Sequence, residues 1–264
     1  MLELYNAFDS LCSQKVKLVL AEKNLEWKNH SLNLLTFENL QPSYIRLNPK
    51  GVVPTLIHDG KVITDSAVIV RYLDEQFPHL LLTPAEPVLQ EKMKGWINLQ
   101  NQFPMRELIY GNYRGIEGVV LRRSVQIKQK LLPQLMQANP ELKEQYEAKL
   151  NDVRQWNSSI QDANEIATIN ARIEPMLAEL EGQLSQTDWL CGAAYSLADA
   201  VWTVVLNRLD ELKFDYLWTD NTRPALKDYL SRIKARPSFR IAIQSDVMPL
   251  SILLVGLRRI FLGI

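Results

Sequence analysis

The chain has 264 residues, 47% of them hydrophobic, which is enough for two modest domains that each bury their own core. Basic and acidic residues each number 30, so the near-zero net charge and the lack of a basic stripe argue against a nucleic-acid partner. The two cysteines are too few for a disulfide framework, which indicates a reducing cytoplasm. The three histidines are scattered and lack the spacing of metal ligands, so no metal site is expected.

The first 77 residues alternate between strand and helix patterns. The expected elements are a strand at 2–5, a helix from about 10 to 23, a strand at 27–32, a short irregular or helical link at 37–45, a hairpin of 52–57 and 61–64, and a helix at 67–77. The chain starts directly on a strand pattern, so no secretory signal is expected. This order predicts a thioredoxin-like α/β domain over residues 1–80.

The hairpin region has a pattern typical of a binding surface. Asp59-Gly60 is a strong turn signal between two apolar runs. Pro54 cannot donate to a strand ladder, and a cis Val53-Pro54 bond would turn the backbone of Val53 toward the backbone of a ligand. Asp65-Ser66 then begins a helix whose first N–H groups can receive a carboxylate. We expect a peptide-like clamp beside an anion pocket; a strand edge and an ordinary helix cap are the alternatives.

Cys12 lies in the first turn of the first predicted helix. The free N–H groups and the dipole of a helix start favour a thiolate over a thiol. Ser10 and Ser13 flank the cysteine, and each hydroxyl can donate a hydrogen bond to a sulfur. These three residues form the candidate catalytic group, with a small buried apolar cysteine as the alternative.

Every element after a proline-rich linker at 79–86 is predicted to be helical, which gives an all-helical domain over residues 87–264. Its first helix is expected at 91–108, and Asn139-Pro140 is expected to cap and begin a later one. Ser196-Leu-Ala-Asp199 has the form of a reciprocal helix cap ahead of a very apolar run.

Aromatic residues of the helical domain are candidates to line an apolar acceptor pocket. Most are expected in the core, since aromatics on helical stripes usually are. The candidates for the acceptor pocket are Trp96, Tyr110, Tyr113, Trp202 and Trp218. Tyr110 and Tyr113 are favoured among them, because they lie in the segment interrupted by Gly111.

Residues 248–264 form an apolar tail with helical periodicity. Its apolar side chains share one face, with arginines largely opposite: Leu250, Leu253, Leu254, Leu257, Phe261 and Ile264 against Arg258 and Arg259. The run is too short and too charged to span a bilayer. The tail can cap the acceptor pocket, cover an apolar patch of the helical domain or lie in a membrane interface, and packing on the protein is the preferred interpretation.

Five motifs in their order resemble the glutathione transferase superfamily. They are Ser10-Leu11-Cys12-Ser13, Val53-Pro54, Asp65-Ser66, Ser196-Leu197-Ala198-Asp199 and Lys234-Ala235-Arg236-Pro237-Ser238-Phe239. Within the superfamily the chain is most similar to the tetrachlorohydroquinone dehalogenase-like subgroup, near the zeta class, and a long insertion at about 111–165 fits that subgroup. The resemblance covers nearly the whole chain and implies a thioredoxin-like domain followed by an all-helical one.

The resemblance implies an enzyme that takes glutathione as co-substrate and activates its thiol for attack on an apolar, aromatic or quinone-like electrophile. Val53-Pro54 would hold the backbone of glutathione, Asp65 and Ser66 its γ-glutamyl end, and Lys50 its glycyl carboxylate. Val52 departs from the pattern, because many relatives have Gln or Lys there.

For Cys12 the resemblance implies a further step. In the dehalogenase subgroup the matching cysteine attacks a glutathionyl-aromatic conjugate, giving a mixed disulfide that a second glutathione releases. Whether Ser10 or Cys12 activates the glutathione thiol stays open. A homodimer is implied by the resemblance alone.

Two other classes of function are compatible with the sequence. One is a non-catalytic transferase-like protein of the ganglioside-induced differentiation-associated type, with an insertion and an apolar tail that works at a membrane. The motifs at Ser10–Ser13 and Asp65-Ser66 argue against it. The other is a regulatory module in which glutathione is structural. The expected location is the cytoplasm, with peripheral membrane association through the tail as an alternative.

Overall fold

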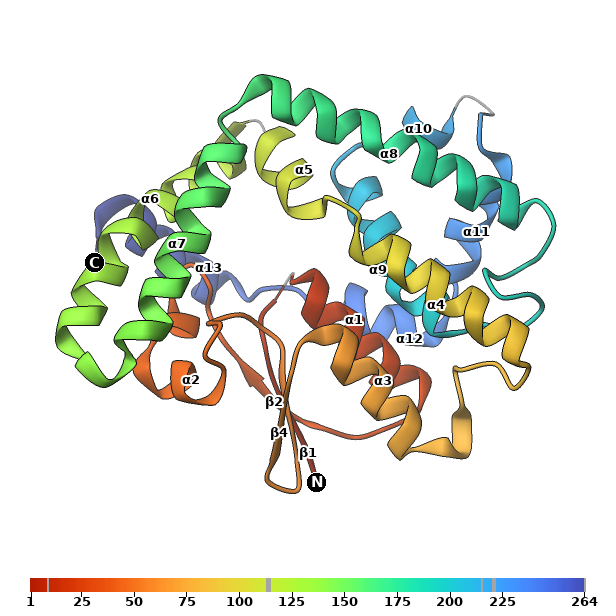
Figure 1. The fold of residues 1–264 in the computed structure, drawn as a ribbon, viewed down its shortest axis with the longest axis horizontal. Coiled ribbons are helices and arrows are strands. Elements are labelled where there is room, and N and C mark those ends of the chain that lie inside the picture. Colours follow the sequence, from red (N-terminus) through yellow and green to blue (C-terminus); the bar gives the residue numbers. More distant parts are fainter. Residues whose placement is uncertain (9, 113–114, 215, 220–221, 264) are drawn as a thin grey trace.

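The computed structural model describes residues 1–8, 10–112, 115–214, 216–219 and 222–263. Within these residues an α/β unit is followed by a helical one (Figure 1), which confirms the predicted fold class. The α/β unit contains four strands and three helices: β1 (Leu2–Asn6), α1 (Leu11–Glu22), β2 (Lys28–Ser31), α2 (Pro42–Leu47), β3 (Thr55–His58), β4 (Lys61–Thr64) and α3 (Ser66–Gln76). Short 3-10 helices at Glu38–Leu40 and Pro78–Leu80 precede α2 and follow α3.

The sheet has the order β2-β1-β3-β4, with β1 parallel to β2 and antiparallel to β3. Asp59 and Gly60 join β3 to β4, and both have positive φ angles, 48° and 85°, as the predicted turn requires. Strand β3 begins at Thr55 rather than at residue 52, so the Val53-Pro54 pair precedes the ladder.

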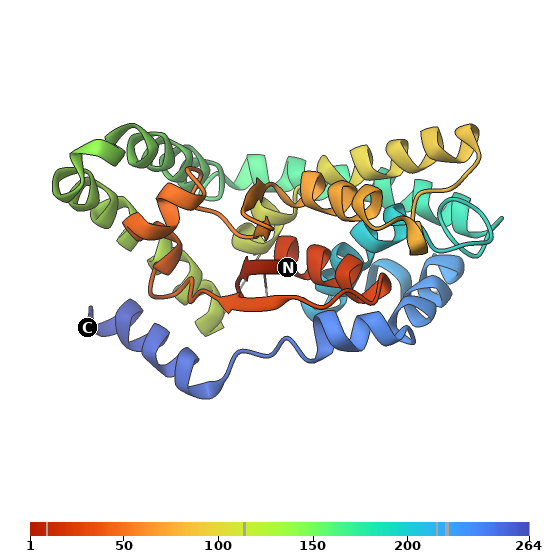
Figure 2. The same cartoon turned by 90° about the horizontal axis from the view of Figure 1, so that it is seen from below.

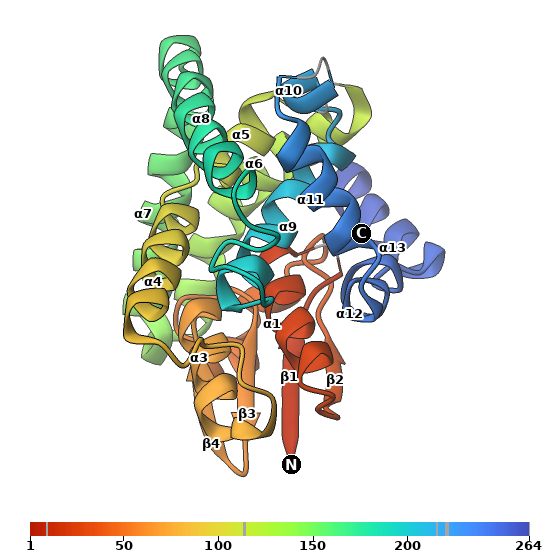
Figure 3. The ribbon, with the colours of Figure 1, turned by 90° about the vertical axis from the view of Figure 1, so that its right-hand side faces the viewer.

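One continuous core joins the α/β unit to the helical unit. Figure 3 shows α1 between the sheet and the helices above it. Fully buried side chains of the sheet, of α1 and of the later helix α9 (Leu197–Glu211) meet here, among them Leu4, Val16, Leu56 and Trp202.

The helical unit has nine further helices among its described residues: α4 (Pro87–Asn101), α5 (Met105–Asn112), α6 (Gly115–Ala138), α7 (Lys143–Ser159), α8 (Ala163–Leu184), α10 (Tyr216–Thr219), α11 (Pro224–Lys234), α12 (Pro237–Phe239) and α13 (Leu250–Leu262). The prediction of a single helix at 91–108 is wrong, because α4 ends at Asn101 and α5 begins at Met105. Pro104, just before α5, has no N–H for a helical hydrogen bond. The helix start expected at Asn139-Pro140 is confirmed in its position, since Asn139 is the N-cap residue and Pro140 the first residue of a 3-10 turn that leads into α7. The side-chain cap expected of Asn139 is not formed, because its Nδ2 donates at 3.0 Å back to the carbonyl of Leu135.

A second core lies where the insertion meets the α/β unit. Helices α6 and α7 form a hairpin (left in Figure 1), and their apolar side chains pack on Phe37, Leu40 and Ile45, which are fully buried. The buried hydroxyl of Tyr146 in α7 donates a 2.9 Å hydrogen bond to the carbonyl of Leu40. The helical unit is therefore attached to the α/β unit at two separate places.

The C-terminal tail packs on the protein, as preferred from the sequence. Helix α13 follows an extended segment along one side of the molecule (Figure 2) and lies against α6 and the loop around Leu35. Asn33 Nδ2 donates to the carbonyl of Ile252 at 3.1 Å, and Arg123 Nε donates to that of Ile260 at 2.8 Å. No helix within the described part of the chain is both long and apolar enough to cross a membrane.

Candidate functional site

Three predicted motifs lie at one end of the sheet. Tyr5 of β1 pairs with Thr55 of β3, and Thr55 pairs with Thr64 of β4. The end of β1 leads to Ser10 and α1, the start of β3 follows Pro54, and the end of β4 leads directly to Asp65. The sheet register thus brings together motifs that are up to 55 residues apart in the sequence.

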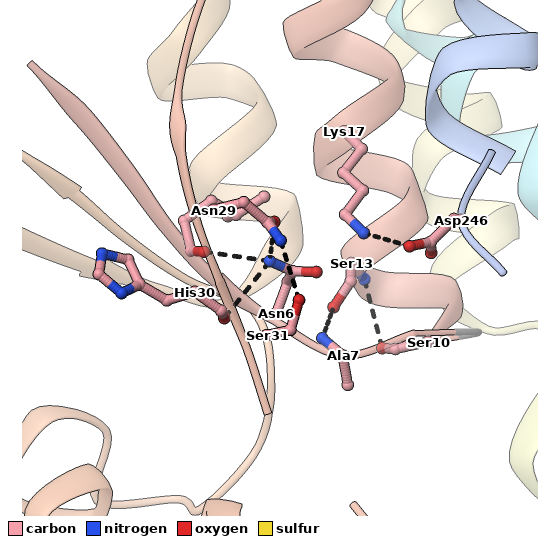
Figure 4. A network of polar contacts seen from close by, with 10 residues as sticks. Asn6, Ala7, Ser10, Ser13, Lys17, Asn29, His30, Ser31 and Asp246 are labelled. Carbon is pink, nitrogen blue, oxygen red and sulfur yellow. Dashed lines mark hydrogen bonds and ion pairs between the residues drawn. The ribbon is translucent and has the colours of Figure 1, made fainter. Parts of the chain in front are cut away.

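The start of α1 presents two of the three candidate catalytic side chains. Ser10 is the N-cap: its Oγ accepts a 3.3 Å hydrogen bond from the N–H of Ser13 (Figure 4). Ser13 is completely buried, and its Oγ accepts from the N–H of Ala7 at 3.3 Å. Cys12 is exposed. The Cys12 thiol and the Ser10 hydroxyl are therefore accessible, whereas Ser13 closes the loop before the helix.

Two polar contacts hold the elements on either side of the loop between β1 and α1 (Figure 4). Asn6, at the end of β1, is fully buried and donates to Asn29 Oδ1 of β2 at 2.5 Å. Lys17 Nζ on α1 donates to Asp246 Oδ1 at 2.5 Å, and both side chains are less than a tenth exposed. The second contact could not be predicted from local patterns, because its partners are 229 residues apart.

The Val53-Pro54 peptide bond is cis, as predicted. The hydroxyl of Tyr44 donates to the carbonyl of Val52 at 2.8 Å and lies 2.9 Å from Thr55 Oγ1. Asn48 Nδ2 also donates to the Val52 carbonyl, at 2.8 Å. Burial raises the pKa of Tyr44, so its hydroxyl stays protonated as a donor. Residues on α2 and the loop that follows it therefore fix the approach to Pro54, and the Val53 N–H and carbonyl have no partner among the described residues.

Asp65 and Ser66 form the start of α3. Asp65 has a φ of 75°, which is uncommon for a non-glycine residue. Its carboxylate accepts from the N–H groups of Ala67 at 2.8 Å and Val68 at 3.4 Å. The expectation that the first helical N–H groups are free is therefore corrected: Asp65 occupies two of them. In the described part of the chain, the Ser66 N–H and hydroxyl have no protein partner.

Lys50 lies exposed in the loop that leads to Pro54. Its backbone N–H donates to Asn48 Oδ1 at 3.2 Å, and Asn39 Nδ2 holds the carbonyl of the next residue, Gly51, at 2.7 Å. Gly51 has a φ of 57°, and a Cβ there would come within 2.9 Å of Ile45 Cδ1. The loop is thus fixed at its backbone while the Lys50 side chain extends into solvent.

Lys15 is a further charged residue at the site that the sequence analysis missed. It is one turn beyond Cys12 on α1, only 5% exposed, and its Nζ donates to Gln100 Oε1 of α4 at 2.8 Å. Burial lowers the pKa of Lys15, while negative charge at Cys12 and at Asp65 opposes that shift. The i, i+3 spacing from Cys12 was the signal available for it.

The aromatic residues proposed for an acceptor pocket have mixed outcomes. Tyr110 packs edge-on against Trp156, with ring centroids 4.3 Å apart, and burial raises its pKa to about 12. It is thus a packing residue next to the second core, whereas Tyr113 lies outside the described residues. The other three are less than a tenth exposed and belong to the first core: Trp96, Trp202 and Trp218.

A cavity of about 280 Å³ lies between α5 and the end of α9. Its walls include Leu108, Ile109 and Phe214, but neither Cys12 nor Tyr110. Within the described residues, no group of three His, Cys, Asp or Glu side chains is placed to hold a metal ion.

Asp199 has the structural role that its motif predicted. It accepts from the Ser196 N–H at 2.8 Å as part of the capping box, and also from the Leu190 N–H and the Tyr229 hydroxyl. Burial raises the pKa of Asp199, and these hydrogen bonds oppose the shift. The motif therefore fixes α9 in the core and lies away from the candidate site.

Comparison with known proteins gives matches over both units. Residues 9–76 match the N-terminal domain of glutathione S-transferase, and residues 156–237 match its C-terminal domain. The tetrachloro-p-hydroquinone reductive dehalogenase of Sphingobium chlorophenolicum is 32% identical over 93% of this chain and 96% of its own length. The human ganglioside-induced differentiation-associated protein 1-like 1 is 27% identical over 90% of this chain and 72% of its own.

Among solved structures, the β-etherase LigF from Sphingobium sp. strain SYK-6 superposes with a TM-score of 0.70, at 25% identity, over 92% of this chain and 99% of its own. Its fold, the two matched domains and the dehalogenase relative agree with the resemblance seen in the five motifs. The chain belongs to the glutathione S-transferase family.

Proposed function

We propose that this protein binds glutathione at the end of the sheet where α1, β3 and α3 begin, and that it transfers the glutathione sulfur to an apolar electrophile. The observation that carries the proposal is the convergence there of three unsatisfied features: an exposed thiol at Cys12, the free backbone groups of Val53, and the free hydroxyl of Ser66. A peptide with a carboxylate at one end and a thiol in its middle complements all three.

Each part of glutathione then has a partner. The γ-glutamyl carboxylate accepts from the Ser66 N–H and hydroxyl, and the cysteinyl backbone pairs with Val53. Lys50 reaches the glycyl carboxylate from its exposed loop. Val52 offers no polar side chain at that end, so we expect a weak grip on the glycyl group.

The start of α1 would activate the glutathione thiol. The Ser10 oxygen already accepts from Ser13, which leaves its proton free to donate to a thiolate sulfur. We therefore assign thiol activation to Ser10 and a structural role to Ser13. The ammonium of Lys15, buried nearby, adds positive charge beside the reacting sulfur atoms.

Cys12 would add a reductive step, as in the dehalogenase-like relatives. The glutathione thiolate first displaces a halide from the acceptor, forming a carbon–sulfur bond. The Cys12 thiolate then attacks the sulfur of the conjugate, and the acceptor carbon leaves with the bonding electrons and takes up a proton. A second glutathione thiolate attacks the resulting mixed disulfide, releasing oxidised glutathione and Cys12. Two glutathione molecules thus supply the two electrons.

The glutathione site is assigned to residues 1–80 and the acceptor site to the helical residues 87–264. A homodimer is proposed from the family resemblance, and a cytoplasmic location from the two free thiols, Cys12 and Cys191.

A crystal soaked with glutathione, together with product analysis on haloaromatic and quinone acceptors, tests the proposal. We expect glutathione between Val53 and Ser66, and a dehalogenated product together with oxidised glutathione. If the protein is not retained on immobilised glutathione and shows no density at this site, the proposal is wrong.

A further inference from the structure

Helix α13 has two faces of different character. On one face Gly256 lies directly against Leu35, and Ile260 is 1% exposed in the second core. The hydrogen bond from Arg123 to the Ile260 carbonyl joins the end of the helix to α6. This face is therefore held by the protein itself.

The opposite face is apolar and open to solvent. The exposed apolar side chains of α13 lie on the half of the helix turned away from Gly256 and Ile260, where Arg258 also lies, and Val247 precedes them in the extended segment. We call these residues the tail stripe: Val247, Leu250, Leu254, Val255, Phe261 and Leu262. Five of them are more than half exposed, from 51% for Leu254 to 70% for Val247.

The charged side chains after Asp246 are all positive. No Asp or Glu follows Asp246 in the sequence, while Arg258 and Arg259 both lie in the helix. Helix α6, on which α13 packs, has no acidic residue from Gly118 to its end, and three of its basic residues are exposed: Arg122, Arg123 and Lys130. Lys128 instead lies over the Phe37 ring in the second core, and burial lowers its pKa to about 8. The guanidinium carbon of Arg123 lies 5.5 Å from the centre of the Phe261 ring. In a chain with equal numbers of acidic and basic residues, this is a marked local excess.

We propose that the tail stripe docks on an anionic lipid surface. A helix whose exposed apolar face also carries basic side chains is suited to lie in the plane of a membrane interface, with the apolar side chains in the acyl boundary and the arginines at the lipid phosphates. The contact is peripheral, because the described helices include none that could span a bilayer.

A second copy of the chain fits this surface less well. A symmetric contact would place the tail stripes of two copies face to face, and with them the arginines at positions 258 and 259 of each. Neither copy has an acidic residue on α13 to neutralise these charges. Like charges brought together in this way oppose association, whereas a phosphate-rich surface neutralises them.

The test is co-sedimentation of the full chain with phosphatidylcholine vesicles, with and without phosphatidylserine. We expect binding only to the anionic vesicles, and weaker binding at high salt. Leu254→Asp should weaken it about tenfold or more, because the side chain faces the acyl boundary. Arg258→Gln with Arg259→Gln should weaken it by about fivefold for each charge removed.

Leu81→Asp is the matched control, because Leu81 is 57% exposed and belongs to the segment between α3 and α4, which is not part of the surface formed by α13 and α6. It should bind vesicles as the unmodified chain does, and circular dichroism should show both aspartate variants folded. The proposal is overturned if the unmodified chain ignores anionic vesicles or if both aspartate variants bind equally. It is also overturned if Leu254→Asp instead converts a lipid-free dimer to a monomer in sedimentation velocity.

Discussion

Lys15 and Gln100 form a hydrogen bond of 2.8 Å between α1 and α4, one helical turn beyond Cys12. The bond holds a nearly buried ammonium group close to the start of α1, where a thiolate is expected to form. Gln100 is neutral, so it satisfies a donor of Lys15 without cancelling its charge. The positive charge thus remains available to the anionic groups around it.

Lys15→Met should slow the alkylation of Cys12 by iodoacetamide at neutral pH by several-fold, because one nearby positive charge is lost. Burial lowers the pKa of Lys15, which means that the folded state disfavours its charged form. Below that pKa the charge reduces the stability of the native state. The melting temperature of Lys15→Met should therefore be equal to or above that of the unmodified protein at neutral pH. Lys94→Met, at an exposed site, is the control for both measurements.

Ser66→Ala should weaken glutathione binding about tenfold or more, since the loss of a hydrogen bond to a charged group typically costs about 1.5–3 kcal/mol. Calorimetric titration measures the affinity, and the melting temperature should change little because the Ser66 hydroxyl has no protein partner among the described residues. Ser185→Ala, at an exposed hydroxyl at the end of α8, should bind normally. Unchanged affinity in a folded Ser66→Ala protein would exclude this pocket.

Iodoacetamide near neutral pH should label Cys12 before Cys191, and bound glutathione should protect Cys12. Cys12 is exposed at a helix start, whereas Cys191 is 3% exposed and burial raises its pKa. Mass spectrometry of the digested protein identifies the labelled residue. Labelling that reaches Cys191 first would remove the basis for a reactive Cys12.

Cys12→Ser should separate the two proposed chemical steps. The conjugate of glutathione with a haloaromatic acceptor should accumulate, because no thiolate is left to attack its sulfur. Conjugation itself should survive if Ser10 activates glutathione. A variant that still forms the dehalogenated product and oxidised glutathione at the normal rate would contradict the role given to Cys12.

Gly256→Ala should lower stability, since a Cβ at this position would lie 2.5 Å from that of Leu35 and would push α13 off the protein. Gly182→Ala in α8 is the matched control: nothing lies within 4 Å of its Cβ, so the better helix propensity of alanine should stabilise by roughly 0.5–1 kcal/mol. Thermal unfolding of both variants checks the prediction. Equal shifts in the two proteins would mean that the docking of α13 contributes nothing to stability.

The parts of the fold that could be predicted from the sequence depend on short-range signals. The Asp59-Gly60 turn and the capping box of Ser196 and Asp199 each involve residues within four positions, so their geometry follows from local chemistry. The break between α4 and α5 was missed because the local signal there is ambiguous. A proline between two apolar helical patterns is compatible with a kink or with a new helix, and packing decides between them.

The contacts that build the candidate site could be predicted only in part. The motifs at Pro54 and Asp65 were recognisable, but Lys15 depends on Gln100, 85 residues away. The contact between Tyr44 and Val52 is closer in sequence, yet it joins the short helix α2 to a loop without a regular period. Such pairings follow from the folded arrangement of elements rather than from their patterns.

The two separate attachments between the units restrict how the molecule can move. A hinge rotation about the contact of α1 with α9 would pull α7 away from the α/β unit. It would break the bond from Tyr146 to the Leu40 carbonyl and expose Phe37, which is now completely buried. We therefore expect an acceptor to enter and leave through movements of side chains and short loops, with the two units fixed relative to each other throughout a catalytic cycle.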